Sequence, residues 1–519
     1  MRRAYKHLVL FVLVSMFVGL GMTASHAESS LAQTAPPFDP TDPNIIFILT
    51  DDMRYDDFNA TYMPKTYSRL VKDPATGQDQ GMSFKNAFVS TPLCCPTRAT
   101  IMRGQYAHNT GIWFNVNGPH GGWEGYNSLG YENENVATQL HAAGYHTGLF
   151  GKYLNQYGAG FTNPALPPRP VDWDEWFAFL HPINYLNYDV NDNGIRKHFG
   201  TKASDYSTDV LKSETLQFID ASVGPDKPPF FAYVAPKAPH DPFASVPRHQ
   251  HDFDTVTAPR LPSFDEKDVS DKPPWIQSWR RLTSDDKAAI NDRHEKRVES
   301  LRSVDDLVGA VVDTLRDRGE LNNTYIVFTS DNGWYHGEHR VRSGKGRPYE
   351  EAPHVPLVIR GPSVQAGSST DELVLDTDYF PTFMDLAGAP TPSYPLDGRS
   401  LLPVLKDPNT TSWGRTAILL EGRGGDDPEI PVDRNYNGIR TSTNKYVEYE
   451  GGFNELYNLK ANAANPVADP YELTNIYDNT NKTGGPTDPP LSDLDTTLDA
   501  LKSCAGDTCR TAEDKLDAP

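Results

Sequence analysis

Two pairs of residues with oxygen-bearing side chains follow apolar runs that are typical of buried strands. The pairs are Asp51-Asp52, directly after the run 44–50, and Asp331-Asn332, after the run 325–329 and one serine. Because the carboxyl ends of parallel strands open on one edge of a sheet, these four side chains could converge on a single cation. Carboxylate and amide oxygens without nearby His or Cys favour Ca²⁺ or Mg²⁺ over zinc. Each pair alone is most often an ordinary turn former, so the prediction depends on finding both.

A third motif is the run Cys94-Cys95-Pro96-Thr97-Arg98. Pro96 suits the first turn of a helix, where its missing N–H costs nothing. Cys94 would then lie at the helix N-terminus, where backbone N–H groups and the helix dipole favour negative charge. Arg98 adds a permanent positive charge one turn later. This setting suits a nucleophile that attacks a sulfate or a phosphate, and it would equally lower the pKa of a structural or redox cysteine.

The pattern C-x-P-x-R is the signature of the type I sulfatases, and the chain resembles that family from about residue 44 to residue 476. The resemblance implies that a formylglycine-generating enzyme converts Cys94 to Cα-formylglycine, also called 3-oxoalanine. It also implies one bound Ca²⁺ ion. The implied ligands of this ion are Asp51, Asp52, Cys94, Asp331 and Asn332.

Further motifs match the side chains that the family places around the sulfate. The implied catalytic residues are Cys94, Arg98, Lys152 in Gly-Lys-Tyr-Leu-Asn, His240 in Ala-Pro-His, and Lys345 in Gly-Lys. Many sulfatases also have a histidine two residues after the first lysine, where this chain has Leu154. The role of this histidine must therefore be taken by another group, for example Asn155, or be absent from this protein. The role of His339 does not transfer from the family, and Lys237 is expected to be an exposed loop lysine.

Local motifs resemble most the N-acetylglucosamine-6-sulfatase branch of the family. The expected reaction is therefore hydrolysis of a sulfate ester, on a sulfated carbohydrate such as N-acetylglucosamine 6-sulfate. Three other functions stay open: an arylsulfatase of broad specificity that acts on aryl sulfates, a formylglycine-dependent phosphonate monoester hydrolase or phosphodiesterase, and an inactive glycan-binding homologue. Five tryptophans could stack on sugar rings or equally pack in the core. They are Trp113, Trp123, Trp173, Trp176 and Trp334.

The elements that must position these residues alternate between strands and helices. Further apolar runs typical of buried strands lie at 145–150, 230–235 and 355–359, and helical patterns lie at 132–143, 208–221 and 302–318. This alternation indicates an α/β fold with a large, mostly parallel sheet flanked by helices. The resemblance narrows the fold to an alkaline-phosphatase-like sandwich.

The chain divides into a long catalytic part and a shorter C-terminal part. The predicted boundaries are 44–411 for the catalytic domain, 412–478 for a smaller C-terminal α+β subdomain with strands near 416–421 and 446–449, and 479–519 for a tail. The tail is rich in Asp, Thr, Pro and Lys, and it is expected to be loosely ordered. Within it, Cys504 and Cys509 could form a small disulfide loop if the protein is exported.

The net charge of the chain and its N-terminal sequence indicate which partners it excludes and where the protein is located. The formal net charge of −21 over 519 residues argues against a nucleic-acid partner, because a polyanion would be repelled. Basic residues near the start precede the apolar run 8–22 and the small-residue site before Ala27. This pattern predicts a signal peptide over 1–27, cleavage near Ala27, and secretion, followed by a lead-in over 28–43. No later run is apolar and long enough for stable membrane insertion.

Overall fold

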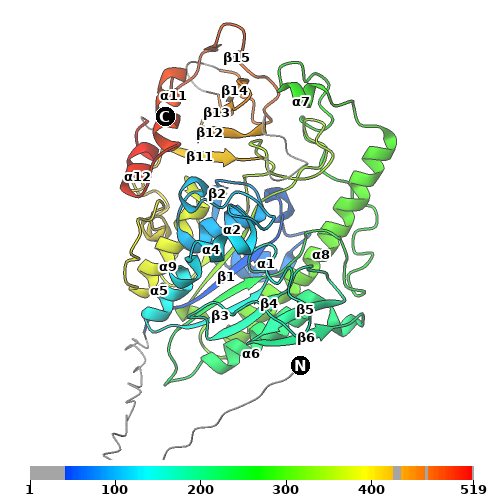
Figure 1. Cartoon of the computed structure of the whole chain (residues 1–519), viewed down its shortest axis with the longest axis vertical. Coiled ribbons are helices and arrows are strands. Elements are labelled where there is room, and N and C mark those ends of the chain that lie inside the picture. Colours follow the sequence, from blue (N-terminus) through cyan, green and yellow to red (C-terminus); the bar gives the residue numbers. More distant parts are fainter. Residues whose placement is uncertain (1–40, 425–433, 462–463, 465, 517–519) are drawn as a thin grey trace, which may run out of the picture. The chain divides into compact units, whose positions relative to one another are not determined.

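The computed structural model describes residues 41–424, 434–461, 464 and 466–516, and it contains two main sheets (Figure 1). The predicted signal peptide lies outside these residues. The larger sheet has ten strands in the order β10-β2-β9-β8-β1-β7-β3-β4-β5-β6. Their bounds are β1 Asn44–Thr50, β2 Met82–Phe88, β3 His146–Gly151, β4 Glu175–Phe179, β5 Tyr188–Asp192, β6 Ile195–Phe199, β7 Phe230–Ala235, β8 Thr324–Ser330, β9 Leu357–Arg360 and β10 Ser369–Leu375.

The centre of this sheet is parallel, as predicted. Strand β1 pairs in parallel with β7 and β8, and β7 pairs in parallel with β3. The predicted strand at 355–359 forms β9, which runs antiparallel to both β8 and β2. The antiparallel extension β4-β5-β6 adds an edge that the sequence patterns did not indicate. The prediction of a mostly parallel sheet is confirmed.

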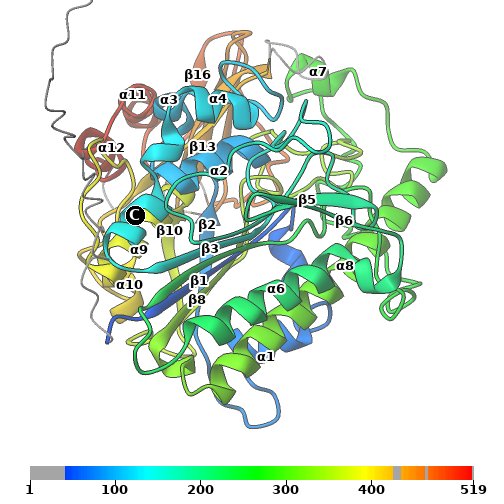
Figure 2. The same ribbon diagram turned by 60° about the horizontal axis from the view of Figure 1, so that its bottom comes forward.

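Helices cover both faces of the larger sheet (Figure 2). Side chains of β1 alternate between two cores, with Ile45, Phe47 and Leu49 in one and Ile46 and Ile48 in the other. This period of two buries both faces of the strand, so helices must cover each side. The helices are α1 Pro64–Leu70, α2 Cys94–Arg103, α3 Ala107–Thr110, α4 Gly122–Ser128, α5 Val136–Ala142, α6 Ser207–Ser222, α7 Pro274–Gln277, α8 Ser284–Asp317, α9 Tyr379–Ala387, α10 Leu402–Lys406, α11 Leu491–Leu501 and α12 Asp507–Glu513.

Helix α8 is twice as long as the predicted helix at 302–318. It spans 34 residues, and its N-terminal half is largely polar, so hydrophobic periodicity missed that half. The start is marked instead by a capping box. Thr283 accepts a hydrogen bond from the Asp286 backbone N–H, and the Asp286 side chain accepts from the Thr283 backbone N–H.

The smaller sheet lies in the predicted C-terminal subdomain. Its four antiparallel strands are β11 Ala417–Gly422, β12 Tyr436–Thr441, β13 Asn444–Tyr449 and β14 Asn454–Asn458. A separate two-stranded ribbon pairs β15 Tyr477–Asp478 with β16 Thr483–Gly484. Both strands expected there, 416–421 and 446–449, are therefore present as β11 and β13.

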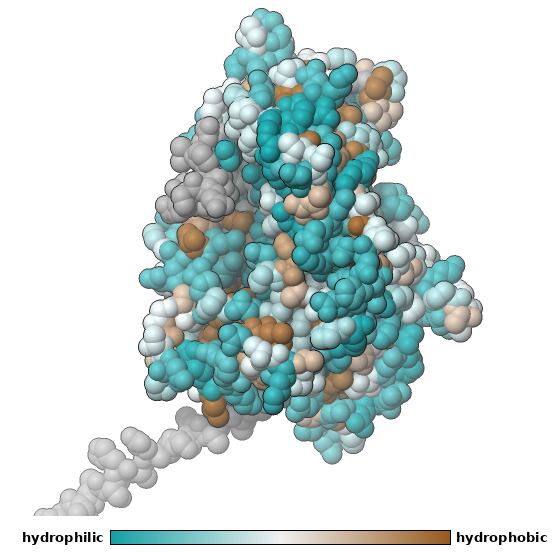
Figure 3. All heavy atoms as spheres, turned by 90° about the vertical axis from the view of Figure 1, so that its right-hand side faces the viewer, coloured by the Kyte–Doolittle hydropathy of each residue, from teal (hydrophilic) through white to brown (hydrophobic). Residues whose placement is uncertain are grey.

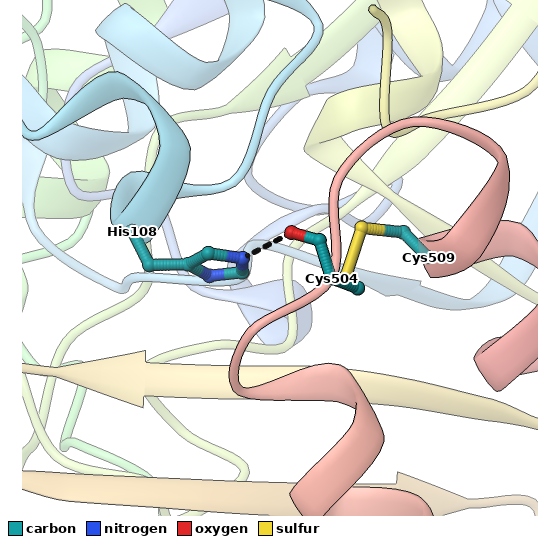
Figure 4. A group of neighbouring side chains, drawn as sticks. All are labelled: His108, Cys504 and Cys509. Carbon is teal, nitrogen blue, oxygen red and sulfur yellow. Dashed lines mark hydrogen bonds between the residues drawn. A yellow bond between two sulfur atoms is a disulfide. The ribbon is translucent and has the colours of Figure 1, made fainter.

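The expectation of a loosely ordered tail is wrong for the part of it that the structure describes. Helices α11 and α12 form there, and Leu494, Leu498 and Leu501 are buried against the smaller sheet. The spacing of these leucines is that of an amphipathic helix, a signal that the polar composition obscured. Cys504 and Cys509 form a disulfide, as was considered possible. Figure 4 shows His108, from α3, donating a hydrogen bond to the carbonyl oxygen of Cys504 at 3.0 Å.

The surface is predominantly polar on the face drawn in Figure 3, with apolar residues scattered over it. This polarity fits the formal net charge of −21. Among the helices in the described ranges, none has both the length and the apolar character needed to cross a bilayer.

Candidate active site

The two oxygen-rich pairs meet at the carboxyl edge of the larger sheet. Strands β1 and β8 are neighbours, with Thr50 beside Ser330, so the residues that follow each strand emerge together. The Asp52 backbone N–H donates to Asp331 Oδ1 at 3.0 Å, and Asn332 Nδ2 donates to Asp52 Oδ1 at 2.7 Å. All four side chains of the two pairs are fully buried.

Helix α2 brings Cys94 and Arg98 to the same point. The helix begins at Cys94, after Leu93 in an extended conformation. Cys94 Sγ lies 3.4 Å from Asp51 Oδ1 and 3.6 Å from Asp52 Oδ1. One turn later, Arg98 Nε donates a hydrogen bond to Asp331 Oδ2 at 2.9 Å, and Arg98 Nη2 forms an ion pair with the same oxygen at 2.9 Å. The sequence prediction that these two residues share a helix start is confirmed.

Two lysines complete the contact with the aspartates. Lys152 follows β3, and its Nζ lies 2.8 Å from each carboxylate oxygen of Asp51. Lys345 Nζ lies 2.6 Å from Cys94 Sγ and also contacts Asp52 Oδ1. Arg98 Nη1 donates to the backbone carbonyl of Lys152 at 2.8 Å, which ties the β3 end to helix α2.

His240 enters from the loop after β7. Its Nε2 lies 3.6 Å from Asp52 Oδ2, and its Nδ1 donates to the backbone carbonyl of Asp241 at 2.8 Å. The Tyr185 hydroxyl donates to the backbone carbonyl of His240 at 2.8 Å. The structure therefore brings all five predicted catalytic residues and all five predicted metal ligands into one cluster, here called the catalytic cluster. Its members are Asp51, Asp52, Cys94, Arg98, Lys152, His240, Asp331, Asn332 and Lys345.

The charges of the catalytic cluster set the protonation of its members. Burial alone would raise the pKa of Asp51, but the charges of Lys152, His240 and Arg98 hold it well below its usual range. By contrast, burial raises the pKa of the Cys94 thiol well above its usual range, and the Asp331 carboxylate adds to this effect. Cys94 is therefore a neutral thiol in this setting, which opposes the reading of it as a low-pKa redox cysteine.

Unpaired oxygen atoms mark a place where a cation fits. Among the described residues, Asp52 Oδ2 and Asn332 Oδ1 are buried without a hydrogen-bond partner. Ligand atoms of Asp51, Asp52, Cys94 and His240 all lie within 4.8 Å of one another. Buried oxygens that lack a donor are costly, and a hard cation would satisfy them. The residues present thus fit a metal ion.

The position of Lys237 differs from the predicted one. It was expected to be exposed, but it is only 5% exposed, and its Nζ lies 3.5 Å from His240 Nδ1. Burial lowers the pKa of Lys237 to about 8. The sequence offered only one usable signal, which is that Lys237 follows a fully buried strand by two residues.

Arg297 is a second residue that sequence patterns missed. It lies in the part of α8 that periodicity did not predict, and it is fully buried. Its Nη2 donates to the backbone carbonyl of Asp52, and its Nη1 donates to that of Pro239 at 3.3 Å. Arg297 therefore joins the loop after β1 to the loop that carries His240.

Two residues whose roles were left open lie outside the catalytic cluster. His339 is buried with its Nδ1 2.7 Å from Glu266 Oε2, and its ring stacks on Tyr349 at 4.2 Å. Burial lowers the pKa of His339 to about 4, so its ring is neutral. Asn155 accepts a hydrogen bond from the Trp123 backbone N–H at its own carbonyl. Among the described residues, neither of the two forms a hydrogen bond with the Cys94 side chain.

The five tryptophans divide into core and site residues. Trp123, Trp173 and Trp176 are buried in the core beside the larger sheet. Trp113 lies beneath Arg423, 4.7 Å from its guanidinium carbon. Trp334 is the one of the five that lies beside the catalytic cluster, with Lys345 Nζ 6.0 Å from its ring centre.

Sequence comparison identifies the class to which this fold and site belong. The profile of the sulfatase family matches residues 43–389, and the profile of the N-sulphoglucosamine sulphohydrolase C-terminal region matches residues 337–485. The chain belongs to the sulfatase family, whose members are sulfuric ester hydrolases. The predictions of the family, the enzyme class and the fold are confirmed.

Named relatives lie within this family. The chain is 34% identical over 500 residues to the N-acetylglucosamine-6-sulfatase of Homo sapiens, covering 90% of this chain and 86% of that protein. It is 31% identical to an arylsulfatase of Volvox carteri, covering 90% of this chain and 75% of that protein. Its fold resembles a solved protein in complex with its substrate D-glucosamine-2-N,6-O-disulfate, with a TM-score of 0.66, 23% identity, and coverage of 92% of this chain and 100% of that chain.

Proposed function

We propose that this sulfatase hydrolyses sulfate esters of a sulfated glycan, such as N-acetylglucosamine 6-sulfate, through a formylglycine made from Cys94. The observation that carries this proposal is the position of Cys94. It stands at the start of α2, in C-x-P-x-R, between two aspartates and the Lys345 ammonium. Support for the glycan comes from the human N-acetylglucosamine-6-sulfatase and from the disulfated glucosamine complex.

Burial of Cys94 bears on how the formylglycine is made. The side chain is fully buried, and burial keeps its pKa well above the usual range, so an unmodified thiol is a poor nucleophile here. A maturation enzyme cannot reach a fully buried residue. We therefore infer that a formylglycine-generating enzyme acts on the chain before it folds around position 94.

The proposed metal is one Ca²⁺ ion. Asp51, Asp52, Asp331, Asn332 and the converted residue 94 would hold it, because four of these offer only hard oxygen ligands and the fifth gains oxygens on conversion. When bound, the ion would supply positive charge next to a formylglycine hydrate at position 94, and one of the two hydroxyls of that hydrate would then lose its proton more easily.

The remaining residues of the catalytic cluster would act on the substrate. Lys152, Lys345 and Arg98 place three positive charges around position 94, where they would balance the negative charge of the sulfuryl oxygens. His240 would protonate the departing alcohol, since its Nε2 faces Asp52 and its Nδ1 is held by the Asp241 carbonyl. Tyr185 fixes the loop that carries this histidine.

The test is mass spectrometry of the peptide that contains Cys94, joined to turnover measurements on the purified protein. We expect the mass change of formylglycine at Cys94, and we expect Cys94→Ser to fold normally and lose multiple turnover, because a serine sulfate ester cannot collapse through a second hydroxyl. Cys95→Ser is the matched control, because it is equally buried and should keep the activity. Multiple turnover by Cys94→Ser at the wild-type rate would refute the proposal.

Substrate choice is tested by comparing four compounds: N-acetylglucosamine 6-sulfate, an aryl sulfate, an aryl phosphate diester and an aryl phosphonate. We expect kcat/KM to be highest for the sulfated sugar. A higher value for the aryl sulfate would identify an arylsulfatase of broad specificity, and a higher value for the phosphorus compounds would identify a phosphonate monoester hydrolase or phosphodiesterase. Binding of the sugar without any turnover would identify a glycan-binding homologue.

Secretion is part of the same proposal. The basic start, the apolar run 8–22 and the small-residue site support cleavage near Ala27. Relatives named as extracellular sulfatases, from Drosophila melanogaster among others, support an extracytoplasmic location. N-terminal sequencing of the protein recovered outside the cytoplasm should begin near residue 28.

A further inference from the structure

The catalytic cluster meets the solvent mainly at two of its side chains. The His240 side chain is 23% exposed and that of Lys345 is 9% exposed, whereas Cys94 and the four oxygen-bearing side chains are fully buried. A sulfate ester must therefore approach position 94 past His240 and Lys345. The alcohol part of the ester, which in a glycan carries the sugar ring, stays on this open side.

Two aromatic residues border this opening. Trp334 follows Asn332 by two residues, and Lys345 Nζ lies 6.0 Å from its ring centre. Phe243 follows His240 by three residues. Both aromatic residues are partly exposed, and their rings meet edge to face, with centres 6.3 Å apart and an interplanar angle of 80°. Trp334 and Phe243 are here called the aromatic wall.

Packing in a hydrophobic core does not explain the aromatic wall. Within the described residues, neither Trp334 nor Phe243 belongs to one of the hydrophobic cores, in contrast to Trp123, Trp173 and Trp176. Partly exposed aromatic rings that lie beside a few convergent polar groups are typical of surfaces that bind a small ligand. The aromatic wall combines these two features.

Arg297 holds both rings from the buried side. Its guanidinium carbon lies 5.0 Å from the ring centre of Trp334 and 5.6 Å from that of Phe243, which is cation–π distance. Arg297 is fully buried and donates to the backbone carbonyls of Asp52 and Pro239. It therefore fixes the rings relative to the catalytic cluster.

The backbone of the aromatic wall is held as well. The Trp334 carbonyl accepts a hydrogen bond from Arg54 Nη1 at 2.7 Å. Next to Phe243 in the chain, the Ala244 carbonyl accepts from the Tyr206 hydroxyl at 2.8 Å. A surface that is fixed before binding loses little conformational entropy when it takes up a ligand.

We propose that the aromatic wall binds the sugar ring that carries the sulfate and so determines which esters the enzyme prefers. This inference rests on the proposed function. One face of a pyranose ring consists largely of C–H groups, and packing that face on an aromatic ring removes apolar area of both from water. His240 and Lys345 then lie next to the oxygen atom that joins the ring to the sulfate.

The experiment compares three sulfate esters on the formylglycine-bearing enzyme. N-acetylglucosamine 6-sulfate has a pyranose ring on a primary alcohol, ethyl sulfate has a primary alcohol without a ring, and p-nitrophenyl sulfate has an aromatic ring. Ethyl sulfate is followed by sulfate release and by its Ki against p-nitrophenyl sulfate. For the wild type we expect kcat/KM to be about tenfold or more higher for the sugar than for ethyl sulfate, because packing on an aromatic ring contributes on that scale.

Trp334→Ala should lower kcat/KM for N-acetylglucosamine 6-sulfate by about tenfold and leave the Ki of ethyl sulfate within about twofold, because only the contact with the ring is lost. Trp334→Phe keeps an aromatic ring and should recover most of the loss. Phe243→Ala should show the same pattern as Trp334→Ala with a smaller loss.

Phe264→Ala is the matched control. Phe264 is also partly exposed and lies 4.0 Å from the guanidinium carbon of an arginine, Arg260, but it packs on the small core that contains Leu282. This variant should keep wild-type kcat/KM for all three esters.

Two results would overturn the inference. One is an equal loss for all three esters in Trp334→Ala, with a higher Ki for ethyl sulfate, because Trp334 would then act on the catalytic cluster through Arg297. The other is unchanged kcat/KM for the sugar, with or without a loss for p-nitrophenyl sulfate. If Trp334→Ala does not fold, Phe243→Ala decides by the same criteria. Absence of sulfate release from every ester would instead refute the proposed function, so the two failures are distinguishable.

Discussion

Asp51 and Asp376 hold equivalent positions in the larger sheet and have opposite electrostatic surroundings. Each is the first residue after its strand, β1 or β10, and those strands run in the same direction. Both side chains are fully buried. Burial alone would raise the pKa of both, yet Asp51 is held well below its usual range by Lys152, whereas the pKa of Asp376 rises to about 8.

The difference lies in the neighbours and not in the strand ends. Asp51 accepts two hydrogen bonds from Lys152 Nζ, while the hydrogen bonds to Asp376 come from the Ser90 N–H and hydroxyl at 3.1 and 3.5 Å. The neighbouring charges that raise the pKa of Asp376 further are negative, from Asp378 and Glu421. A buried aspartate at the edge of a parallel sheet becomes part of a reactive site only where cations meet it, and elsewhere it is a neutral hydrogen-bonding group.

The largest effect is expected from Asp51→Asn, which removes the carboxylate that the cations surround. The substitution leaves the Lys152 ammonium buried without its carboxylate and removes a proposed metal ligand. We expect kcat/KM to fall by about 100-fold or more, since even groups that only support a metal ligand are worth ~10–100-fold. Breaking a buried ion pair should also lower the free energy of unfolding by ~3–5 kcal/mol, measured by urea denaturation.

Asp376→Asn is the control for that variant, because it removes an equally buried strand-end carboxylate that forms no ion pair within the described part of the chain. It should retain wild-type kcat/KM. If Asp51→Asn and Asp376→Asn lost activity to the same extent, position in the sheet would matter and the surrounding charges would not.

Strand ends predicted that the two oxygen-rich pairs would meet, whereas Lys152, His240 and Lys345 were predicted from the resemblance to the sulfatase family. Asp51, Lys152, His240 and Asp331 all follow parallel strands, and the sheet brings those ends together whatever the loops do. The same rule gave no reason to separate Asp51 from Asp376. The two residues differ in which cationic side chains lie next to each carboxylate in the folded protein. The spacing of residues along the chain does not reveal this.

Contacts made by long loops and by remote segments escaped prediction for a related reason. The surroundings of Arg347 include Trp275 and Trp279, about 70 residues earlier, so they exist only in the folded chain. Lys237 was expected at the surface because a lysine in a short loop is usually solvated, but here the loop turns inward toward His240.

Lys237→Met tests the same comparison by removing a buried cation instead of a carboxylate. Lys237 is buried beside His240, and among the described residues its Nζ makes no ion pair within 4 Å, so its charge is directed at the catalytic cluster. We expect kcat/KM to fall by about 10- to 100-fold, the size of one charged hydrogen bond. Lys237→Arg should recover part of the loss. Unchanged kcat/KM in Lys237→Met, with normal thermal unfolding, would show that this lysine only fills space.

Asp376→Asn also tests the smallest effect, which is on stability as a function of pH. In the folded protein the pKa of Asp376 is about 8, against an ordinary value of 3.8. Between these values the folded state keeps a proton that the unfolded state has lost. The contribution of Asp376 to stability is therefore fully present below about pH 4 and declines as the pH rises toward 8, by up to ~1.4 kcal/mol per pH unit. Asn cannot titrate and can still accept from the Ser90 N–H, so the variant should lose less stability than the wild type between pH 5 and pH 8. Urea denaturation at several pH values measures this, and parallel pH profiles for the two proteins would mean that Asp376 is ionised in the folded state after all.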